Sequence, residues 1–220
     1  MIAIRELRFR WPRAARDTVA IAELDIGAGE SVFLHGPSGC GKSTLLGLLA
    51  GVLLPTAGTV AVQGQDWAAL PAARRDAARA DHVGYIFQQF NLLGYLSVLD
   101  NVRLPCRFSK ARAARAEAGA AEALLDRVAL PREAWPRPAS ALSVGQQQRV
   151  AAARALIGGP QLVIADEPTS ALDAGLRDGF MDLLLGETRA RGATLVFVSH
   201  DERLAAQFDR RLSLPELNRA

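Results

Sequence analysis

The chain has few of the residues that cross-link secreted domains, and it lacks a stretch suited to crossing a membrane. Its two cysteines, Cys40 and Cys106, fit neither a CxxC nor a zinc-ligand spacing, so we expect no disulfide framework and a reducing compartment. Apolar runs such as LVFVS are far shorter than the roughly 20 residues of a membrane helix. The N-terminus carries charges every few residues instead of the apolar segment of a signal peptide. We therefore expect a soluble chain that depends on another polypeptide for any membrane-spanning part.

Lysine is equally scarce, since only Lys42 and Lys110 occur among the 26 basic residues. The net charge of +3 is mildly basic and does not by itself indicate a nucleic-acid-binding protein. Half of the 220 residues are apolar, which is enough for a sizeable core without disulfides. This length suits one large domain, or a core with an inserted lobe.

Short strand-like runs alternate with helical patterns over much of the chain. Alternating apolar and polar residues at 2–10 and 18–26 predict strands of an antiparallel sheet with one solvent-exposed face. Further strands are predicted at residues 31–36, 58–64, 83–87, 161–166 and 193–199. Helices are predicted at residues 42–50, 72–81, 109–128, 144–157 and 174–190, and after Asp201. This alternation predicts an α/β fold.

One internal segment has only helical patterns, because no strand-like run occurs between Gln88 and Gln161. We interpret it as a helical subdomain, at about residues 89–158, inserted into a single domain. The core of that domain then consists of residues 1–88 and 159–220.

Residues 36–43 fit the pattern G-x-x-x-x-G-K-[ST], between a predicted strand and a predicted helix. Its glycines let successive amides point at one site, and the helix N-terminus adds positive potential, so the loop suits a phosphate. Lys42 would reach the β- and γ-phosphates of a nucleotide, and the Ser43 hydroxyl would ligate Mg²⁺. A compact ammonium fits inside this closed loop where a broad guanidinium does not, which explains a lysine in an arginine-rich chain. The predicted nucleotide-binding residues are Gly36, Pro37, Ser38, Gly39, Cys40, Gly41, Lys42, Ser43 and Thr44.

Two acids, Asp166 and Glu167, follow the apolar run LVIA at the end of a predicted buried strand. An open α/β sheet binds its ligand at this edge, so Asp166 is a candidate Mg²⁺ ligand. Glu167 is a candidate general base for the water that attacks the γ-phosphate. His200 follows another predicted strand, and its imidazole is suited to hydrogen-bond the γ-phosphate.

The segment ALSVGQQQRVAAARAL, at residues 141–156, resembles the LSGGQ signature of ABC (ATP-binding cassette) ATPases. Four further positions resemble family marks in the family's order: an adenine-stacking aromatic at Trp11, the Q-loop glutamine at Gln88, the D-loop at residues 170–173 and the switch histidine at His200. The resemblance covers roughly residues 2–213. It implies a P-loop NTPase core, with a mixed sheet flanked by helices and an N-terminal antiparallel β subdomain, and an inserted helical subdomain that carries the signature.

The resemblance implies ATP and Mg²⁺ as cofactors and a head-to-tail dimer that buries two ATP molecules. Ser143, Gly145 and Gln146 of one copy would then contact the nucleotide held by the other copy. The implied catalytic residues are Lys42, Gln88, Glu167 and His200, and the implied metal ligands are Ser43, Gln88 and Asp166. One residue departs from the family pattern: Val144 replaces the first signature glycine, and a β-branched residue disfavours positive φ and adds bulk near the nucleotide.

The segments VGYIFQQFNLL and LSVLDNVRLP most resemble the lipoprotein-releasing and macrolide-export branch of the family. This branch implies an integral membrane permease as partner and a place at the cytoplasmic face of the inner membrane. A periplasmic adaptor or binding protein is left open as a further component. Five apolar residues after Gln88 either pack into the core or form a groove for a permease helix. They are Phe90, Leu92, Leu93, Tyr95 and Leu96.

Two alternative functions remain at this point. Amino-acid and metal importers share much of the same pattern, and some ABC ATPases act on DNA or ribosomes instead of a permease. The arginines at 5, 8, 10, 13 and 16 are a candidate phosphate-backbone surface. We interpret them instead as a solvated face and expect no nucleic-acid partner, because the chain has neither paired cassettes nor a long coiled-coil insertion.

Overall fold

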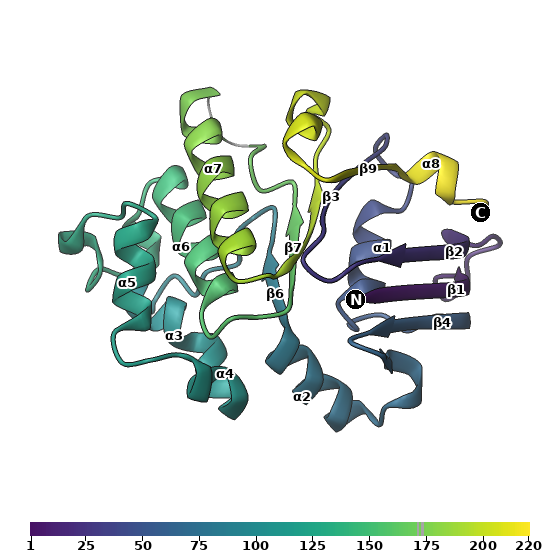
Figure 1. The fold of residues 1–220 in the computed structure, drawn as a ribbon, viewed down its shortest axis with the longest axis horizontal. Coiled ribbons are helices and arrows are strands. Elements are labelled where there is room, and N and C mark those ends of the chain that lie inside the picture. The colour runs from purple at the N-terminus through teal and green to yellow at the C-terminus, as the bar shows by residue number, and fades with distance from the viewer. Residues whose placement is uncertain (171, 173) are drawn as a thin grey trace.

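The computed structural model describes residues 1–170, 172 and 174–220 (Figure 1). Its strands are β1 (Ile2–Phe9), β2 (Val19–Ile26), β3 (Ser31–His35), β4 (Ala57–Val62), β5 (Gln65–Asp66), β6 (Val83–Ile86), β7 (Leu162–Asp166), β8 (Thr194–Val198) and β9 (Arg210–Ser213). Its helices are α1 (Lys42–Leu49), α2 (Ala72–His82), α3 (Val98–Phe108), α4 (Lys110–Arg115), α5 (Ala120–Arg127), α6 (Val144–Leu156), α7 (Ala174–Ala190) and α8 (Leu214–Leu217). In the described part of the chain, no helix is long and apolar enough to cross a bilayer.

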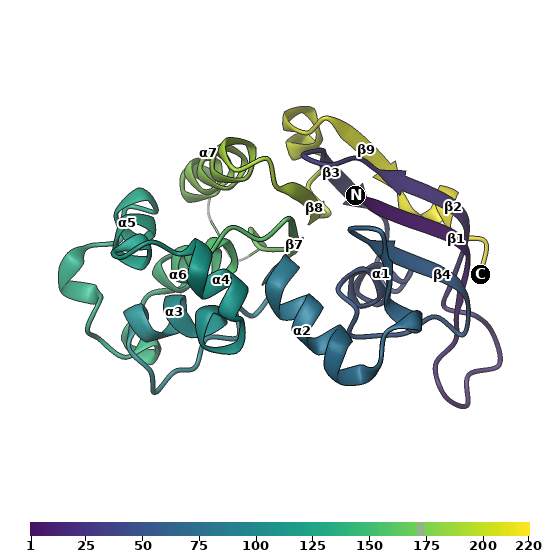
Figure 2. The same ribbon diagram turned by 60° about the horizontal axis from the view of Figure 1, so that its bottom comes forward.

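The strands form two separate sheets. One is antiparallel in the order β2-β1-β4-β5, and the other is parallel in the order β6-β7-β8-β3-β9. The antiparallel strands and the parallel strands therefore belong to two different sheets. Figure 2 shows the antiparallel sheet at one end of the molecule and the helices α3–α6 at the other.

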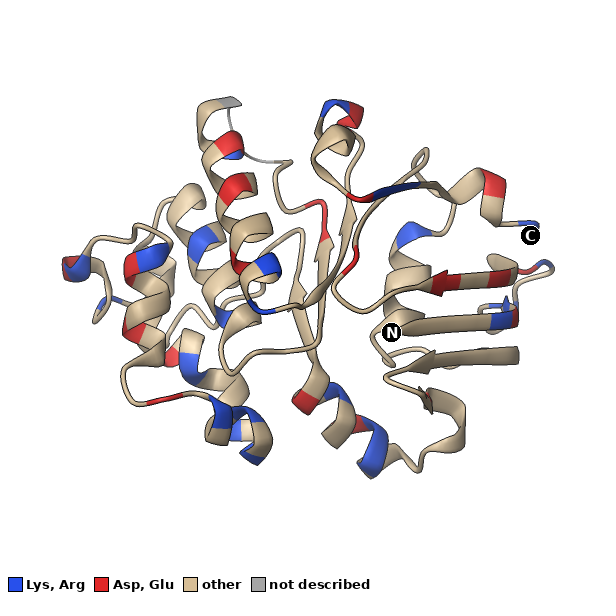
Figure 3. Ribbon diagram, in the orientation of Figure 1, with Lys and Arg blue, Asp and Glu red and all other residues tan. Residues whose placement is uncertain are grey.

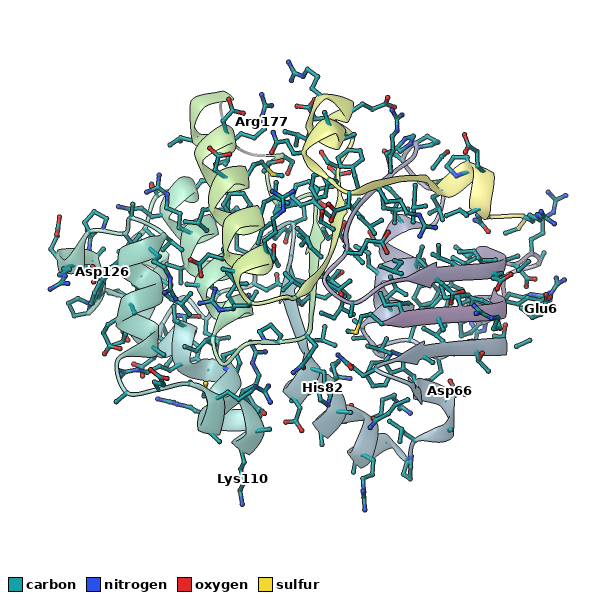
Figure 4. The ribbon with its side chains drawn as sticks, in the orientation of Figure 1. Glu6, Asp66, His82, Lys110, Asp126 and Arg177 are labelled. Carbon is teal, nitrogen blue, oxygen red and sulfur yellow. The ribbon has the colours of Figure 1, made fainter. Side chains whose placement is uncertain are left out.

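Helix α1 packs between the two sheets because the parallel strands are apolar on both faces. In β7, Leu162 and Ile164 point into the core shared with α1 and the antiparallel sheet. Val163 and Ala165 point to the opposite face, into the core shared with α3, α5, α6 and α7. Side chains alternate between faces with a period of two, so one continuous apolar run supplies both cores. Figure 4 shows side chains filling the space on both sides of the sheet.

Between β6 and β7 the described residues form helices α3–α6 and short 3₁₀ turns, with one isolated bridge from Ser97 to Pro138. The helix predicted at 109–128 is two helices, α4 and α5, because Gly119 has a φ of 81° that interrupts the helical pattern. Helix α3 was not predicted. Ser97 caps it by accepting a hydrogen bond from the Asp100 amide, but Pro105 inside the helix weakens its sequence pattern. The subdomain boundaries stay a prediction.

The end of the chain also differs from the prediction. A 3₁₀ helix, η4 (Glu202–Gln207), replaces the helix predicted after Asp201. The edge strand β9 was not predicted, because Leu212 is its one buried residue and gives no apolar alternation. Strand β9 pairs in parallel with β3, and α8 follows it directly.

Two glycines give opposite predictions for stability. A Cβ on buried Gly84 of β6 would lie 2.3 Å from the Ala155 carbonyl oxygen, so Gly84→Ala must displace β6 from α6. We expect a loss of roughly 2–3 kcal/mol in the free energy of unfolding. A Cβ on Gly186, exposed in α7, would meet no atom within 4 Å, so Gly186→Ala should gain up to about 1 kcal/mol from helix propensity. Urea unfolding measures the stability of both variants. Equal unfolding midpoints for the two variants would contradict the prediction.

Candidate functional site

The register of the parallel sheet brings the ends of its central strands to one edge. Leu34 pairs with Val198, and Val198 pairs with Asp166 on the next strand. Ala165 pairs with Ile86 at the same level. The loops that leave these four strands therefore start side by side, as the sequence predicted for the carboxyl ends of parallel strands.

The loop after β3 wraps around a lysine. The Lys42 ammonium donates hydrogen bonds to the carbonyls of Gly36, at 2.7 Å, and Pro37, at 3.0 Å. Gly41 has a φ of 101°, and a Cβ there would lie 3.0 Å from the Thr18 carbonyl oxygen. A side chain is thus excluded at Gly41 by conformation and by space. Lys110, the other lysine, is exposed and points away from α4 (Figure 4).

Asp166 lies next to this loop at the end of β7. Burial raises the pKa of the Asp166 carboxyl above its ordinary value, and the charge of Glu167 raises it further. A hydrogen bond from Ser43 and the charge of Lys42 act in the opposite direction on the same pKa. A partly buried carboxylate bonded to a hydroxyl is a pair of oxygen ligands of the kind that Mg²⁺ prefers, so these residues fit that ion.

Glu167 and His200 are in direct contact although they leave different strands. The Nδ1 atom of His200 lies 3.0 Å from Oε2 of Glu167. Because an ionised carboxylate only accepts hydrogen bonds, Nδ1 carries the proton in this pair. The amide of Glu167 donates to the Val198 carbonyl at 3.0 Å, and Glu167 has a φ of 44°. That backbone conformation is uncommon for a residue other than glycine, and it occurs here at the predicted catalytic acid.

The start of α6 forms a capping box. The Ser143 hydroxyl accepts from the Gln146 amide at 3.3 Å, and the Gln146 side chain accepts from the Ser143 amide at 3.0 Å. Val144 is the first helical residue, and its side chain is 49% exposed. Neither Val144 nor Gly145 has a positive φ. The backbone conflict expected for a β-branched residue at this position is therefore absent, and the added bulk of Val144 faces outward.

The structure does not bring the signature to its own phosphate loop. In Figures 1 and 2, α6 and α1 lie on opposite sides of the parallel sheet. The start of α6 is therefore not part of the site formed by the phosphate loop of the same chain. Two residues of the predicted D-loop, Ala171 and Asp173, lie outside the described residues.

Trp11 and Gln88 are both exposed in loops. Trp11 is 45% exposed and makes an edge-on contact with Phe9, with ring centroids 5.1 Å apart. It borders a hollow of about 500 Å³ together with Arg8, Arg10 and Asp17. An exposed ring at the rim of a hollow suits stacking on a base. Gln88 lies in the turn after β6, at the same sheet edge as Asp166.

Two buried arginines that the sequence interpretation missed hold irregular backbone together. Arg154 on α6 donates to the carbonyls of Phe90 and Asn91, both at positive φ just after Gln88. Arg112 on α4 donates to the carbonyls of Ala155, at 2.7 Å, and Ile157, at 2.8 Å. Burial lowers the pKa of Arg112 to about 10. A charged residue within an otherwise apolar helical run, as in RVAAARAL, was the sequence signal for Arg154.

Three arginines of the N-terminal cluster form ion pairs, two of them with the same acid. Arg5 pairs with Asp25 at 2.8 Å. Arg8 and Arg10 both pair with Asp17. These acids partly balance the charge of the cluster, and the absence of a nucleic-acid partner stays a prediction.

A glycine loop around a lysine, beside a carboxylate pair at the edge of a parallel sheet, defines a P-loop ATPase. Within that class the chain belongs to the ABC transporter family, whose sequence profile matches residues 19–170. The predicted family is confirmed, and the chain is an ATP-binding ATPase.

Two relatives indicate the branch. The lipoprotein-releasing system ATP-binding protein LolD of Anaeromyxobacter dehalogenans is 45% identical over 87% of this chain and 80% of its own length. The macrolide export ATP-binding/permease protein MacB of Rhodopseudomonas palustris is 39% identical over 98% of this chain. The chain spans about a third of the length of the MacB relatives that it matches, since 33% of this MacB is covered.

The fold is also that of solved cassettes. The ATP-binding cassette MJ0796, in a dimeric post-hydrolysis state bound to ADP and Pi, superposes with a TM-score of 0.85 at 33% identity. The match covers 97% of this chain and 94% of that one. The predicted fold class is confirmed.

The enclosed lysine gives a prediction about ATP turnover. Lys42→Arg should reduce the rate at least about 100-fold, because a planar guanidinium does not fit where the ammonium meets the Gly36 and Pro37 carbonyls. Phosphate release by the purified chain measures this. The matched control is Lys110→Arg, which changes the other, exposed lysine and should retain the wild-type rate. Wild-type turnover by Lys42→Arg would show that the loop does not select lysine.

Proposed function

We propose that this chain hydrolyses MgATP in a head-to-tail dimer of two copies to power a membrane permease of the lipoprotein-releasing and macrolide-export type. The observation that carries the proposal is that the site is divided. One sheet edge holds the phosphate loop together with Asp166, Glu167 and His200. The start of α6 lies on the other side of the sheet. The names of the LolD and MacB relatives support the branch.

In the proposed site, the Lys42 ammonium and the backbone amides of residues 36–44, except Pro37, bind the β- and γ-phosphates. Trp11 stacks on the adenine. The hydroxyl of Ser43 and the side chains of Asp166 and Gln88 would hold Mg²⁺, whose charge offsets that of the phosphates. The hydrogen bond between Ser43 and Asp166 already places two of these ligands together.

Hydrolysis then depends on Glu167 and His200. Glu167 accepts the proton of the water that attacks the γ-phosphate, and the new P–O bond forms as the bond to the β-phosphate oxygen breaks. The hydrogen bond from His200 Nδ1 to Oε2 holds this carboxylate in place. Nε2 of His200 then donates to the γ-phosphate in the imidazolium form, in which both ring nitrogens carry a proton.

The second copy completes the site. Ser143, Gly145 and Gln146 at the start of α6 bring a helix N-terminus to the γ-phosphate bound by the partner. The capping box fixes the Ser143 and Gln146 side chains before any nucleotide arrives, so little ordering remains on dimer formation. A two-fold arrangement then uses both sites in the same way.

The permease is proposed to dock in a cavity of about 630 Å³ beside α2, β6 and α3. Phe87, Val52 and Phe108 line it and are exposed by 38%, 63% and 75%. Arg112 and Arg154 also line it, and Figure 3 shows Lys and Arg gathered on α2 and α4 nearby. An apolar helix with an acidic residue fits this lining. Docking there would hold the chain at the cytoplasmic face of the inner membrane.

The five apolar residues after Gln88 do not line this cavity, so a permease groove formed by them would be a different surface. Phe90 is buried in the core, and Leu92 packs against it. Tyr95 is 80% exposed but lies outside the cavity, as do Leu93 and Leu96. Phe90 and Leu92 therefore pack into the chain's own core, which was one of the two interpretations of this segment.

The proposed general base gives the central test. Glu167→Gln keeps the shape of the side chain but cannot take the proton, so turnover should fall by about 10²–10⁴-fold. Dimers with bound nucleotide should accumulate, because the bridging γ-phosphate is no longer removed. Phosphate release and size-exclusion chromatography with MgATP measure the two effects.

The matched control is Glu133→Gln, which makes the same change at an exposed position in the turn before Trp135 and should behave as wild type. Turnover of the Glu167→Gln variant within a few-fold of wild type would show that another group is the base. A wild-type chain that stays monomeric in MgATP, with and without its permease, would contradict the dimer.

The docking cavity gives a second test. Phe87→Asp and Phe108→Asp should each lower co-purification with the permease at least about tenfold, because a carboxylate replaces an apolar contact. Tyr95→Asp, which changes an exposed aromatic outside the cavity, should co-purify as wild type does. The docking proposal fails if all three variants retain the permease equally.

A further inference from the structure

The side chain of Asn218 joins two separated backbone segments, residues 18–20 and the phosphate loop at Cys40. Its Oδ1 accepts from the Ala20 amide at 2.7 Å. Its Nδ2 donates to the Thr18 carbonyl at 3.0 Å and to the Cys40 carbonyl at 3.2 Å. These partners fix the orientation of the carboxamide, because only the NH₂ group can donate to two carbonyls.

The bond to Cys40 sets the direction of a peptide in the phosphate loop. In a planar trans peptide, the Cys40 carbonyl and the Gly41 N–H point in opposite directions. Asn218 holds this carbonyl on the α8 side of the loop, so the Gly41 N–H points to the other side. Gly41 has a φ of 101° and, as glycine, few conformational limits of its own. An external bond is therefore the effective restraint on this amide.

The segment at residues 214–219, which contains α8, also contacts Gly36, the first glycine of the phosphate loop, and strand β2. A Cβ on Gly36 would lie 3.0 Å from Cδ of Pro215, so α8 closes against the loop at both ends. The Arg219 amide donates to the Ala20 carbonyl at 2.8 Å, which ties the segment to β2. Thr18 donates to the Phe9 carbonyl at 2.8 Å and closes the loop that carries Trp11. Asn218 thus connects the loop that carries Trp11 with the phosphate loop.

We propose that Asn218 is a positioning residue for nucleotide binding, which aims the Gly41 amide at the phosphates and fixes the Trp11 loop relative to them. Asn218 lies outside every sequence motif described above. The inference rests on nucleotide binding at the proposed site. Because Asn218 acts on ground-state binding, its loss should weaken affinity and leave the chemical step intact.

The test compares Asn218→Asp with wild type in the full chain. The carboxylate keeps the bond from Ala20 but loses both donated bonds and adds a negative charge near the phosphates. We expect the Kd for MgADP and the KM for ATP to rise about tenfold, with kcat at saturating ATP within about twofold. The control Glu216→Gln, an exposed change within α8, should alter neither constant.

Asn218→Ala provides a second variant without the added charge. It should show faster amide hydrogen exchange across residues 36–44 than the Glu216→Gln control, and weaker MgADP binding. The proposal is overturned if either Asn218 variant, folded as judged by circular dichroism, binds MgADP as tightly as wild type. It is also overturned if exchange across the loop is unchanged. Failure of the wild-type chain itself to bind MgADP would instead contradict the proposed site.

Discussion

The parallel register of β6, β7, β8 and β3 is the constraint on which the site depends. It aligns Leu34, Val198 and Asp166 across three strands, so the lysine loop, the two acids and His200 emerge at one level. Apolar side chains on both faces fix this register, because a shift would disrupt the packing on α1 and on α6 together. The chemistry of the site is thus held in place by hydrophobic packing rather than by charge.

Arginine and lysine have different tasks in this protein. Arg112 and Arg154 are buried and donate several hydrogen bonds each to main-chain carbonyls, where a guanidinium with five donors satisfies irregular backbone. Lys42 instead sits within a small ring of backbone that a compact charge fits. The identity of each of these three basic residues therefore follows from the geometry at its position.

The sequence predicts what depends on local pattern. The buried strands, the phosphate loop and the α6 start have periodicity, glycine spacing or a capping serine that can be read directly. Helix α3, the break at Gly119 and strand β9 depend on caps, positive φ or an edge position and gave weak signals. The link from Asn218 to Ala20 spans 198 positions in the chain, so local patterns could not reveal it. The pairing of Glu167 with His200 likewise needs the folded sheet.

Arg154 and Ala155 lie at the end of α6 that borders the cavity next to Phe87, whereas Ser143 lies at the other end of the same helix. With 13 residues, α6 is a rod about 20 Å long. Arg154 also binds the carbonyls that follow Gln88, so the rod and that loop are fastened together at one point. In the proposed dimer, a permease seated in the cavity and the neighbouring copy would therefore contact opposite ends of one short helix.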